Sequence, residues 1–185
     1  MKQELTYAGR RGRAGFTLVE QIMALAVAAV LACMAAPSLH AMLVRTQLRT
    51  AQMDYYSALQ YARTSAILQQ RRMLLCPSRD GRRCSDETDW TAGWLVGPDQ
   101  DRDNQPDGAP LRVGQDHGRR IRVASTIGRR SMHFQPDGSA EGSNLTLLFC
   151  PSSGAAAQAL SLKVSNAGRV RAAPAAPGDC ASRPP

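Results

Sequence analysis

Two arginines near the C-terminal end, Arg169 and Arg171, are separated by one residue and follow Gly168. In an extended segment, residues i and i+2 point to the same side, so both guanidinium groups would face solvent while Val170 packs inward. A guanidinium group binds phosphate oxygens through paired hydrogen bonds, and phosphate contacts supply most nonspecific DNA affinity. The pair therefore indicates a phosphate-binding site. A charged edge strand that discourages aggregation would have the same pattern.

The C-terminal half of the chain carries an excess of positive charge. The formal net charge of the chain is +8, and residues 111–185 contain ten Lys or Arg residues against four acids. Such an excess suggests a polyanionic partner, although many basic proteins have only a solvated positive face. Basic residues that would extend the site are Lys163, Arg119, Arg120, Arg122, Arg129 and Arg130. Aromatic residues are not interleaved with them, which favours contacts with the backbone of double-stranded DNA over base stacking.

Glu20 is a carboxylate near the start of an apolar segment that extends to Leu39, and a basic leader precedes it. About 20 apolar residues span the hydrocarbon core of a bilayer. A charge in that core is costly unless it has a partner or a path to water, and a cationic amine at the same depth would offset the cost. The acid therefore implies a function within the membrane segment.

The sequence around this acid is Gly15-Phe16-Thr17-Leu18-Val19-Glu20, which resembles the class III signal of type IV pilins and type II secretion pseudopilins. The resemblance implies that a prepilin peptidase cleaves between Gly15 and Phe16 and methylates Phe16. It also implies that Glu20 pairs with the N-terminal amine of a neighbouring pilin subunit. The alternatives are a secretory signal peptide ending at Ala41, whose apolar run would be unusually long, and a plain membrane anchor, which does not require this motif.

The expected organisation is a leader peptide at 1–15, a transmembrane and assembly helix at 16–44, and a globular head at 45–185. The helix should continue past Pro37 into an amphipathic segment at 45–70, because apolar residues recur there at helical spacing. These residues are Leu48, Ala51, Tyr55, Ala58, Ala62 and Ala66. A head of this size has room for one modest core.

Beyond residue 70 the pattern changes to short strand-like runs separated by turn residues. The runs cover 72–76, 93–96, 121–125, 132–134, 145–149 and 159–164. We therefore predict an α+β fold in which one long helix, with a hydrophobic transmembrane first half, packs on an antiparallel β-sheet head. The β region spans 71–165, and a basic C-terminal tail occupies 166–185.

Four of the five cysteines, Cys76, Cys84, Cys150 and Cys180, lie in the part that is expected to be exported, where disulfides persist. Four cysteines can pair in three ways. We favour Cys76 with Cys84, which would close a short polar loop, and Cys150 with Cys180, which would tie the tail to the strand ending near Phe149. Metal binding is the alternative, but CxxC spacing is missing and the histidines are scattered.

The stretch from Asp99 to Asp107 contains alternating carboxylates, an arrangement that can hold calcium. Asn104 stands where an EF-hand loop has its turn glycine, and Pro110 stands where that loop has its bidentate glutamate. Asp and Asn also favour turns, because their side chains hydrogen-bond to nearby backbone groups. We therefore favour a polar turn between strands, with calcium as the alternative.

Four further segments narrow the resemblance to the FimT/GspH group of minor pilins. They are Leu75-Cys76-Pro77-Ser78, Trp90-Thr91-Ala92-Gly93-Trp94, Phe134-Gln135-Pro136-Asp137-Gly138 and Asn166-Ala167-Gly168-Arg169-Val170-Arg171. A FimT-like protein would be a pilus component of a Gram-negative bacterium that binds extracellular DNA for natural transformation. Its DNA-binding Gly-Arg-x-Arg signature would map onto Gly168, Arg169 and Arg171. The alternatives are a GspH-like minor pseudopilin of the type II secretion system and a purely structural minor pilin.

The sequence contains no glycine-rich phosphate loop, no serine and histidine paired in a motif, and no zinc signature. We therefore predict a protein that is not an enzyme and that uses no cofactor or metal. Its expected partners are double-stranded DNA, other pilin subunits, the prepilin peptidase and, before assembly, the inner membrane, with the head in the periplasm.

Overall fold

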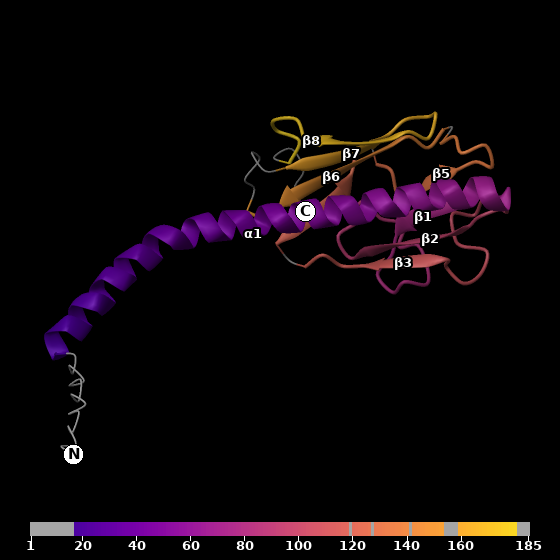
Figure 1. The fold of residues 1–185 in the computed structure, drawn as a ribbon. Coiled ribbons are helices and arrows are strands. Elements are labelled where there is room, and N and C mark those ends of the chain that lie inside the picture. The colour runs from indigo at the N-terminus through magenta and orange to yellow at the C-terminus, as the bar shows by residue number, and fades with distance from the viewer. Residues whose placement is uncertain (1–16, 119, 127, 141, 154–158, 181–185) are drawn as a thin grey trace, which may run out of the picture. The chain divides into compact units, whose positions relative to one another are not determined.

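The computed structural model describes residues 17–118, 120–126, 128–140, 142–153 and 159–180. Gly15 and Phe16, the expected cleavage and methylation positions, lie outside the described residues, and so does Arg119. The chain divides into two compact units, residues 1–40 and 41–185. One helix, α1 (Leu18–Gln69), begins in the first unit and ends in the second (Figure 1). The predicted continuation of the helix past residue 37 is therefore confirmed.

In the first unit, α1 begins just after Thr17. The hydroxyl oxygen of Thr17 accepts a hydrogen bond from the backbone N–H of Glu20 at 3.3 Å, which caps the first turn of the helix. Every side chain from Leu18 to Met34 is exposed, and most of them are apolar. This part of α1 is long and apolar enough to cross a membrane.

The second unit contains two four-stranded antiparallel sheets within its described residues. The strand order is β3-β2-β1-β5 in the first sheet and β4-β6-β7-β8 in the second. The strands are β1 (Met73–Pro77), β2 (Gly93–Pro98), β3 (Arg112–Gln115), β4 (Ile121–Ser125), β5 (Met132–Phe134), β6 (Leu145–Pro151), β7 (Leu160–Val164) and β8 (Val170–Pro174). The predicted α+β class, with a long helix and an antiparallel head, is confirmed.

Two strands, β3 and β8, were not among the predicted runs. The side chains of β3 are mostly exposed, and Val170 is the single buried side chain of β8, so neither strand has an apolar alternation that the sequence could reveal. Both are edge strands. An edge strand of this kind is fixed by hydrogen bonds to its neighbour rather than by its own composition.

The core of the head lies where α1 packs against both sheets. Tyr55 is central to it: its ring lies 6.2 Å from that of Trp94 on β2 and 5.6 Å from that of Phe149 on β6, measured between centroids. Its hydroxyl group donates a hydrogen bond to the backbone carbonyl of Trp90. All six residues predicted for the buried stripe of the helix are fully buried, namely Leu48, Ala51, Tyr55, Ala58, Ala62 and Ala66.

Trp94 is fixed by a hydrogen bond as well as by packing. Its indole N–H donates to Oδ2 of Asp54 on α1 at 2.8 Å, and Nε2 of His117 lies 3.0 Å from the same oxygen. Burial raises the pKa of Asp54, but the hydrogen bonds with His117 and Trp94 outweigh this effect, and the net pKa lies below the usual value. Asp54 therefore holds α1 to the first sheet as a charged group.

Both favoured disulfides are present. The Cys76–Cys84 bridge closes the loop that follows β1, and the Cys150–Cys180 bridge ties residues beyond β8 to β6. Cys76 also packs with Leu74 and Leu95 in a small apolar cluster that is separate from the main core. The second bridge fixes the end of the segment that carries the predicted arginine pair.

We expect the double substitution Cys150→Ser/Cys180→Ser to lower the free energy of unfolding by about 2–4 kcal/mol, because a bridge of this kind restricts the unfolded chain. The two cysteines are 30 residues apart in the sequence. Urea denaturation of the purified protein measures the change. The matched control is Cys33→Ser, which removes a free thiol and should leave the stability unchanged. Equal stability of the double variant and the control would contradict the prediction.

Candidate nucleic-acid interface

Strands β7 and β8 form an antiparallel hairpin that carries the predicted arginine pair. Val164 and Val170 lie opposite each other across the hairpin, and both are buried. Lys163 and Arg171 lie opposite each other in the neighbouring row, and both are exposed, as is Arg169. The two-residue period of the strands therefore places the cations on the solvent side and Val170 inward, as predicted.

The turn between these strands is held by short-range hydrogen bonds and by one close backbone contact. The backbone N–H of Ser165 donates to the carbonyl of Arg169 at 3.1 Å, and that of Gly168 donates to the carbonyl of Ser165 at 2.8 Å. Gly168 has a φ of +73°, and a Cβ at this position would overlap the carbonyl oxygen of Gly138. Nε of Arg63 donates to the same oxygen at 2.9 Å. Gly168 therefore lets the turn pack against Gly138, and this contact fixes the segment that carries Arg169 and Arg171.

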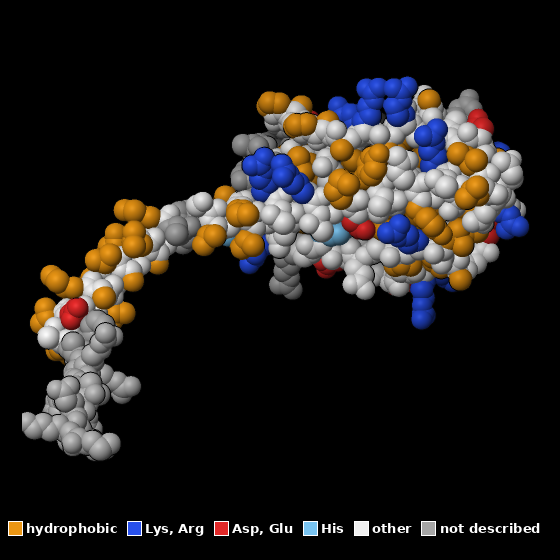
Figure 2. Space-filling model, in the orientation of Figure 1, with side chains coloured by type: hydrophobic (Ala, Val, Ile, Leu, Met, Phe, Trp, Pro, Cys, Tyr) orange, Lys and Arg blue, Asp and Glu red, His pale blue; other side chains and the backbone are white. Residues whose placement is uncertain are grey.

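A shallow hollow of about 430 Å³ opens beside the hairpin. It is lined by Thr146, Lys163, Val164, Ser165, Arg169 and Arg171, of which three are cations and none is acidic. Lys163 and Arg171 form a like-charged cross-strand pair, which is unfavourable until an anion neutralises it. The hydroxyl groups of Thr146 and Ser165 are further donors for phosphate oxygens. Figure 2 shows basic side chains along the edge of the head where Figure 1 draws β7 and β8.

Arg129 lies at the same end of the second sheet. Its Nη2 donates to Oδ1 of Asn144 at 3.1 Å. Asn144 directly precedes β6, and Thr146 on that strand pairs with Lys163. Arg129 thus contacts the residue before β6, but it does not line the hollow.

Arg120 and Arg130 of the predicted set do not line the hollow. Nη1 of Arg130 lies 2.8 Å from Oδ2 of Asp86 in an ion pair. Arg120 lies just before the first residue of β4. Thr146, which lines the hollow, lies beside the other end of β4, where its carbonyl accepts a hydrogen bond from the backbone N–H of Thr126. A five-residue strand is about 17 Å long, so Arg120 is too distant to share one anion with Lys163.

Sequence reasoning missed Thr146 and Ser165. Their position beside Lys163 depends on the register between β6 and β7 and on the shape of the turn after β7. A weak signal existed for Thr146, because it is the polar residue between Leu145 and Leu147 in an alternating strand. The pairing partner of a strand cannot be read from such alternation.

We expect Gly168→Ala to destabilise the head more than Gly142→Ala does. The two glycines have the same φ of +73°, but a Cβ at Gly142 would meet open space. The strain of a positive φ costs about 1–2 kcal/mol in either variant, and the overlap with Gly138 should add about 1–3 kcal/mol for Gly168→Ala alone. Urea denaturation of both variants tests this difference. Equal losses would mean that the close contact does not contribute.

The fold is similar to those of known minor pilins. The crystal structure of the type IV minor pilin FimU from Pseudomonas aeruginosa strain PAO1 matches with a TM-score of 0.59 and 23% identity, over 70% of this chain and 90% of that chain. A second crystal form of FimU gives a TM-score of 0.55 and 24% identity, over 68% and 92%. The minor pseudopilin EpsH from the type 2 secretion system of Vibrio cholerae gives 0.50 and 12%, over 69% and 97%. At sequence identities this low, the matches show that the proteins share a fold.

The sequence itself identifies the family. No protein with a curated description matches this chain. Residues 51–168, which are more than half of the chain, match the family described as Type II transport protein GspH. The structural likeness to a type IV minor pilin and to a minor pseudopilin agrees with this match. The chain therefore belongs to the GspH/FimT family of type IV pilin-like minor pilins.

Proposed function

We propose that this minor pilin binds extracellular double-stranded DNA and takes part in its uptake during natural transformation. The observation that carries the proposal is the hollow beside the β7–β8 hairpin, where Lys163, Arg169 and Arg171 converge with no acidic residue among its lining. The order Gly168-Arg169-Val170-Arg171 also resembles the DNA-binding signature of FimT-like proteins. An exposed site of this kind suits a long polyanion better than a small enclosed ligand.

The geometry favours contact with the phosphate backbone. Duplex DNA carries one negative charge for about every 1.7 Å of its axis, so closely spaced cations can each meet a phosphate. Lys163 and Arg171 lie directly opposite each other, with Cβ atoms about 5 Å apart as in other cross-strand pairs. Arg171 and Arg169 offer planar guanidinium groups for paired hydrogen bonds. Backbone contacts carry no sequence information, so the proposed binding has little sequence preference.

The hairpin is held in place before any ligand binds. Val164 and Val170 belong to the main core, and Gly168 rests against the backbone of Gly138. The Cys150–Cys180 disulfide fixes the chain beyond β8. A site that is already ordered loses less conformational entropy on binding, which supports affinity from a small number of charged contacts.

Assembly of the subunit is the second part of the proposal. We infer that a prepilin peptidase of a Gram-negative inner membrane removes residues 1–15 and methylates Phe16. Glu20, in the first turn of α1, then pairs with the N-terminal amine of a neighbouring subunit. The carboxylate stands in an apolar helix surface, where a cationic partner offsets its cost. Before assembly the head would lie in the periplasm, and afterwards on an extracellular pilus.

A second candidate function is that of a minor pseudopilin in a type II secretion system. The family description and the likeness to EpsH favour it. In that case the basic hairpin would be a solvated surface or a contact with another subunit, and the isolated protein would not bind DNA. A purely structural minor pilin would give the same result, so DNA binding separates the proposed function from both alternatives.

We expect Arg169→Ala/Arg171→Ala to weaken binding of the full-length, detergent-solubilised protein to duplex DNA more than about tenfold at low salt, because each hydrogen bond to a charged group contributes about 1.5–3 kcal/mol. The loss should be the same for duplexes of different sequence. The slope of log affinity against log salt should fall by roughly 0.9 for each lost phosphate contact. Mobility-shift measurements over a salt series give both quantities.

The matched control is Arg82→Ala/Arg83→Ala, which removes the same charge from two exposed arginines in the loop closed by Cys76–Cys84. This control should bind like the wild type. Equal weakening in both double variants would mean that net charge, not the hairpin, carries the affinity. If the wild type binds no DNA, the secretion pseudopilin or structural pilin is favoured instead.

We expect the mature protein to begin at N-methylated Phe16. Glu20→Ala should insert into the membrane, because the apolar length of α1 is unchanged, but it should be absent from filaments. Mass spectrometry of the mature N-terminus and immunoblots of sheared filaments test the two statements. Glu20→Asp keeps a carboxylate and should retain part of the incorporation. A mature start at Met42 would contradict the pilin signal, and normal incorporation of Glu20→Ala would contradict the pairing.

A further inference from the structure

The loop between β2 and β3 brings three carboxylates together. Asp99, Asp101 and Asp107 each present a carboxylate oxygen, and these oxygens all lie within 4.8 Å of one another. Oxygens that bind one Ca²⁺ ion at about 2.3–2.6 Å lie at most about 5 Å apart, so the spacing fits the coordination sphere of this ion. Exposed acids often cluster without any ion, but Asp99 is not exposed.

The carboxylate of Asp99 is completely buried. Neither of its oxygens has a hydrogen-bond partner of normal geometry among the described residues, although the backbone N–H of Arg102 lies near the carboxyl group. Nη1 of Arg72 and Nε2 of His133 lie 3.3 Å and 3.2 Å from Oδ2, whereas Oδ1 has neither contact. A buried carboxylate oxygen normally has a hydrogen-bond donor or a cation as its partner, because it has lost its hydration. The buried Oδ1 of Asp99, which has no such partner, therefore points to a cation beside this loop, as does the spacing of the three carboxylates.

The charges around Asp99 also favour a further cation. Arg72 is the one arginine or lysine among the described residues that forms an ion pair with Asp99, at 3.3 Å from Oδ2. Carboxylate oxygens of Asp101 and Asp107 lie within 4.8 Å of one from Asp99, so this single arginine faces three acids.

We propose that the loop from Asp99 to Asp107 binds a calcium ion through the carboxylates of Asp99, Asp101 and Asp107. Ca²⁺ takes several oxygen ligands in flexible geometry, whereas Mg²⁺ demands a near-ideal octahedron and keeps much of its water. Zinc prefers nitrogen and sulfur ligands, which this cluster lacks. Oδ1 of Asp99 can bind the ion while Oδ2 keeps its contact with Arg72. The sequence favoured a simple turn because it could not reveal the burial of Asp99.

The backbone of the loop already holds these side chains in position. The N–H of Gln100 donates to Oδ2 of Asp107 at 2.7 Å, and the N–H of Gln105 donates to Oδ1 of Asp103 at 2.7 Å. Arg102 and Asn104 adopt positive φ values of 66° and 65°, which turn the chain sharply between the aspartates. Binding therefore requires little rearrangement of the loop.

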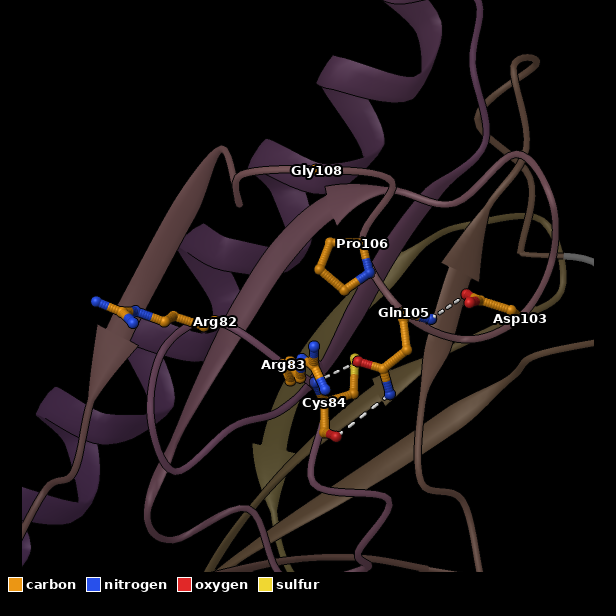
Figure 3. A pocket seen from close by; sticks show the side chains of 7 residues that line it. All are labelled: Arg82, Arg83, Cys84, Asp103, Gln105, Pro106 and Gly108. Atoms are coloured by element: carbon orange, nitrogen blue, oxygen red, sulfur yellow. Dashed lines mark hydrogen bonds between the residues drawn. The ribbon is translucent and has the colours of Figure 1, made fainter.

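The ion would also brace a second loop. Figure 3 shows the side chain of Gln105 between the two loops: its Oε1 accepts from the backbone N–H of Cys84 at 2.9 Å, and its Nε2 donates to the carbonyl of Cys84 at 3.3 Å. Cys84 is held in turn by its disulfide with Cys76. Calcium at the acidic loop is thus expected to stabilise the outer side of the first sheet.

The test uses the full-length, detergent-solubilised protein after removal of metal with a chelator. Calcium chloride at about 1 mM, a concentration suited to extracellular calcium sites, should raise the midpoint of thermal unfolding by a few degrees, and titration calorimetry should show a saturable site. Magnesium chloride at the same concentration should give a much smaller shift. Asp101→Asn/Asp107→Asn, which alters two exposed residues, should lose the calcium shift and weaken binding at least about tenfold.

The matched control is Asp116→Asn/Asp137→Asn, which removes the same charge from exposed positions outside the loop and should keep the full calcium response. The proposal is overturned if the wild type shows no calcium response, if magnesium gives an equal one, or if Asp101→Asn/Asp107→Asn responds like the control. The result is independent of DNA binding, because the acidic loop belongs to the first sheet and the basic hairpin to the second.

Discussion

The packing of one face of α1 against both sheets is the interaction on which the rest of the head depends. Each sheet has an apolar inner side, and the helix is the element that covers both of them. Tyr55 shows this most directly, since its ring contacts Trp94 of the first sheet and Phe149 of the second. Each large side chain that is fully buried in this way contributes about 1.5–3 kcal/mol from the hydrophobic effect. The inner sides of the sheets therefore form the hydrophobic core, and their outer sides are free to bind ligands.

The loops outside the two sheets differ in their charged groups and suit different ligands. On the first sheet, two loops cover a small apolar cluster around Cys76, and one of these loops presents the carboxylates of Asp99, Asp101 and Asp107. On the second sheet, Lys163 and Arg171 stand side by side next to a hollow without acids. The acidic cluster and the basic hairpin belong to different sheets, so each can bind its own ligand.

A close backbone contact positions the basic hairpin. Gly168 lies against the carbonyl group of Gly138, and Arg63 on α1 donates to the same oxygen. The turn that precedes Arg169 is therefore tied to the helix as well as to its own strands. The glycine and the arginines of this short motif thus have different physical roles. The glycine permits the approach of two backbones, and the arginines supply charge at a fixed place.

The sequence by itself determined the features that depend on local spacing. These include the buried stripe of α1, the strands at 121–125 and 132–134, the inward position of Val170 and the favoured disulfide pairs, all of which the structure contains. Apolar period, turn residues and loop length act over a few residues, so they can be read directly from the chain. The tertiary structure alone decided where the basic residues lie: Lys163 stands beside Arg171, Arg129 donates to Asn144, Arg130 pairs with Asp86, and Arg120 lies at the far end of β4. It alone also formed β3 and β8 and buried Asp99. Strand register and burial arise from contacts between residues far apart in the sequence, and no local pattern encodes them.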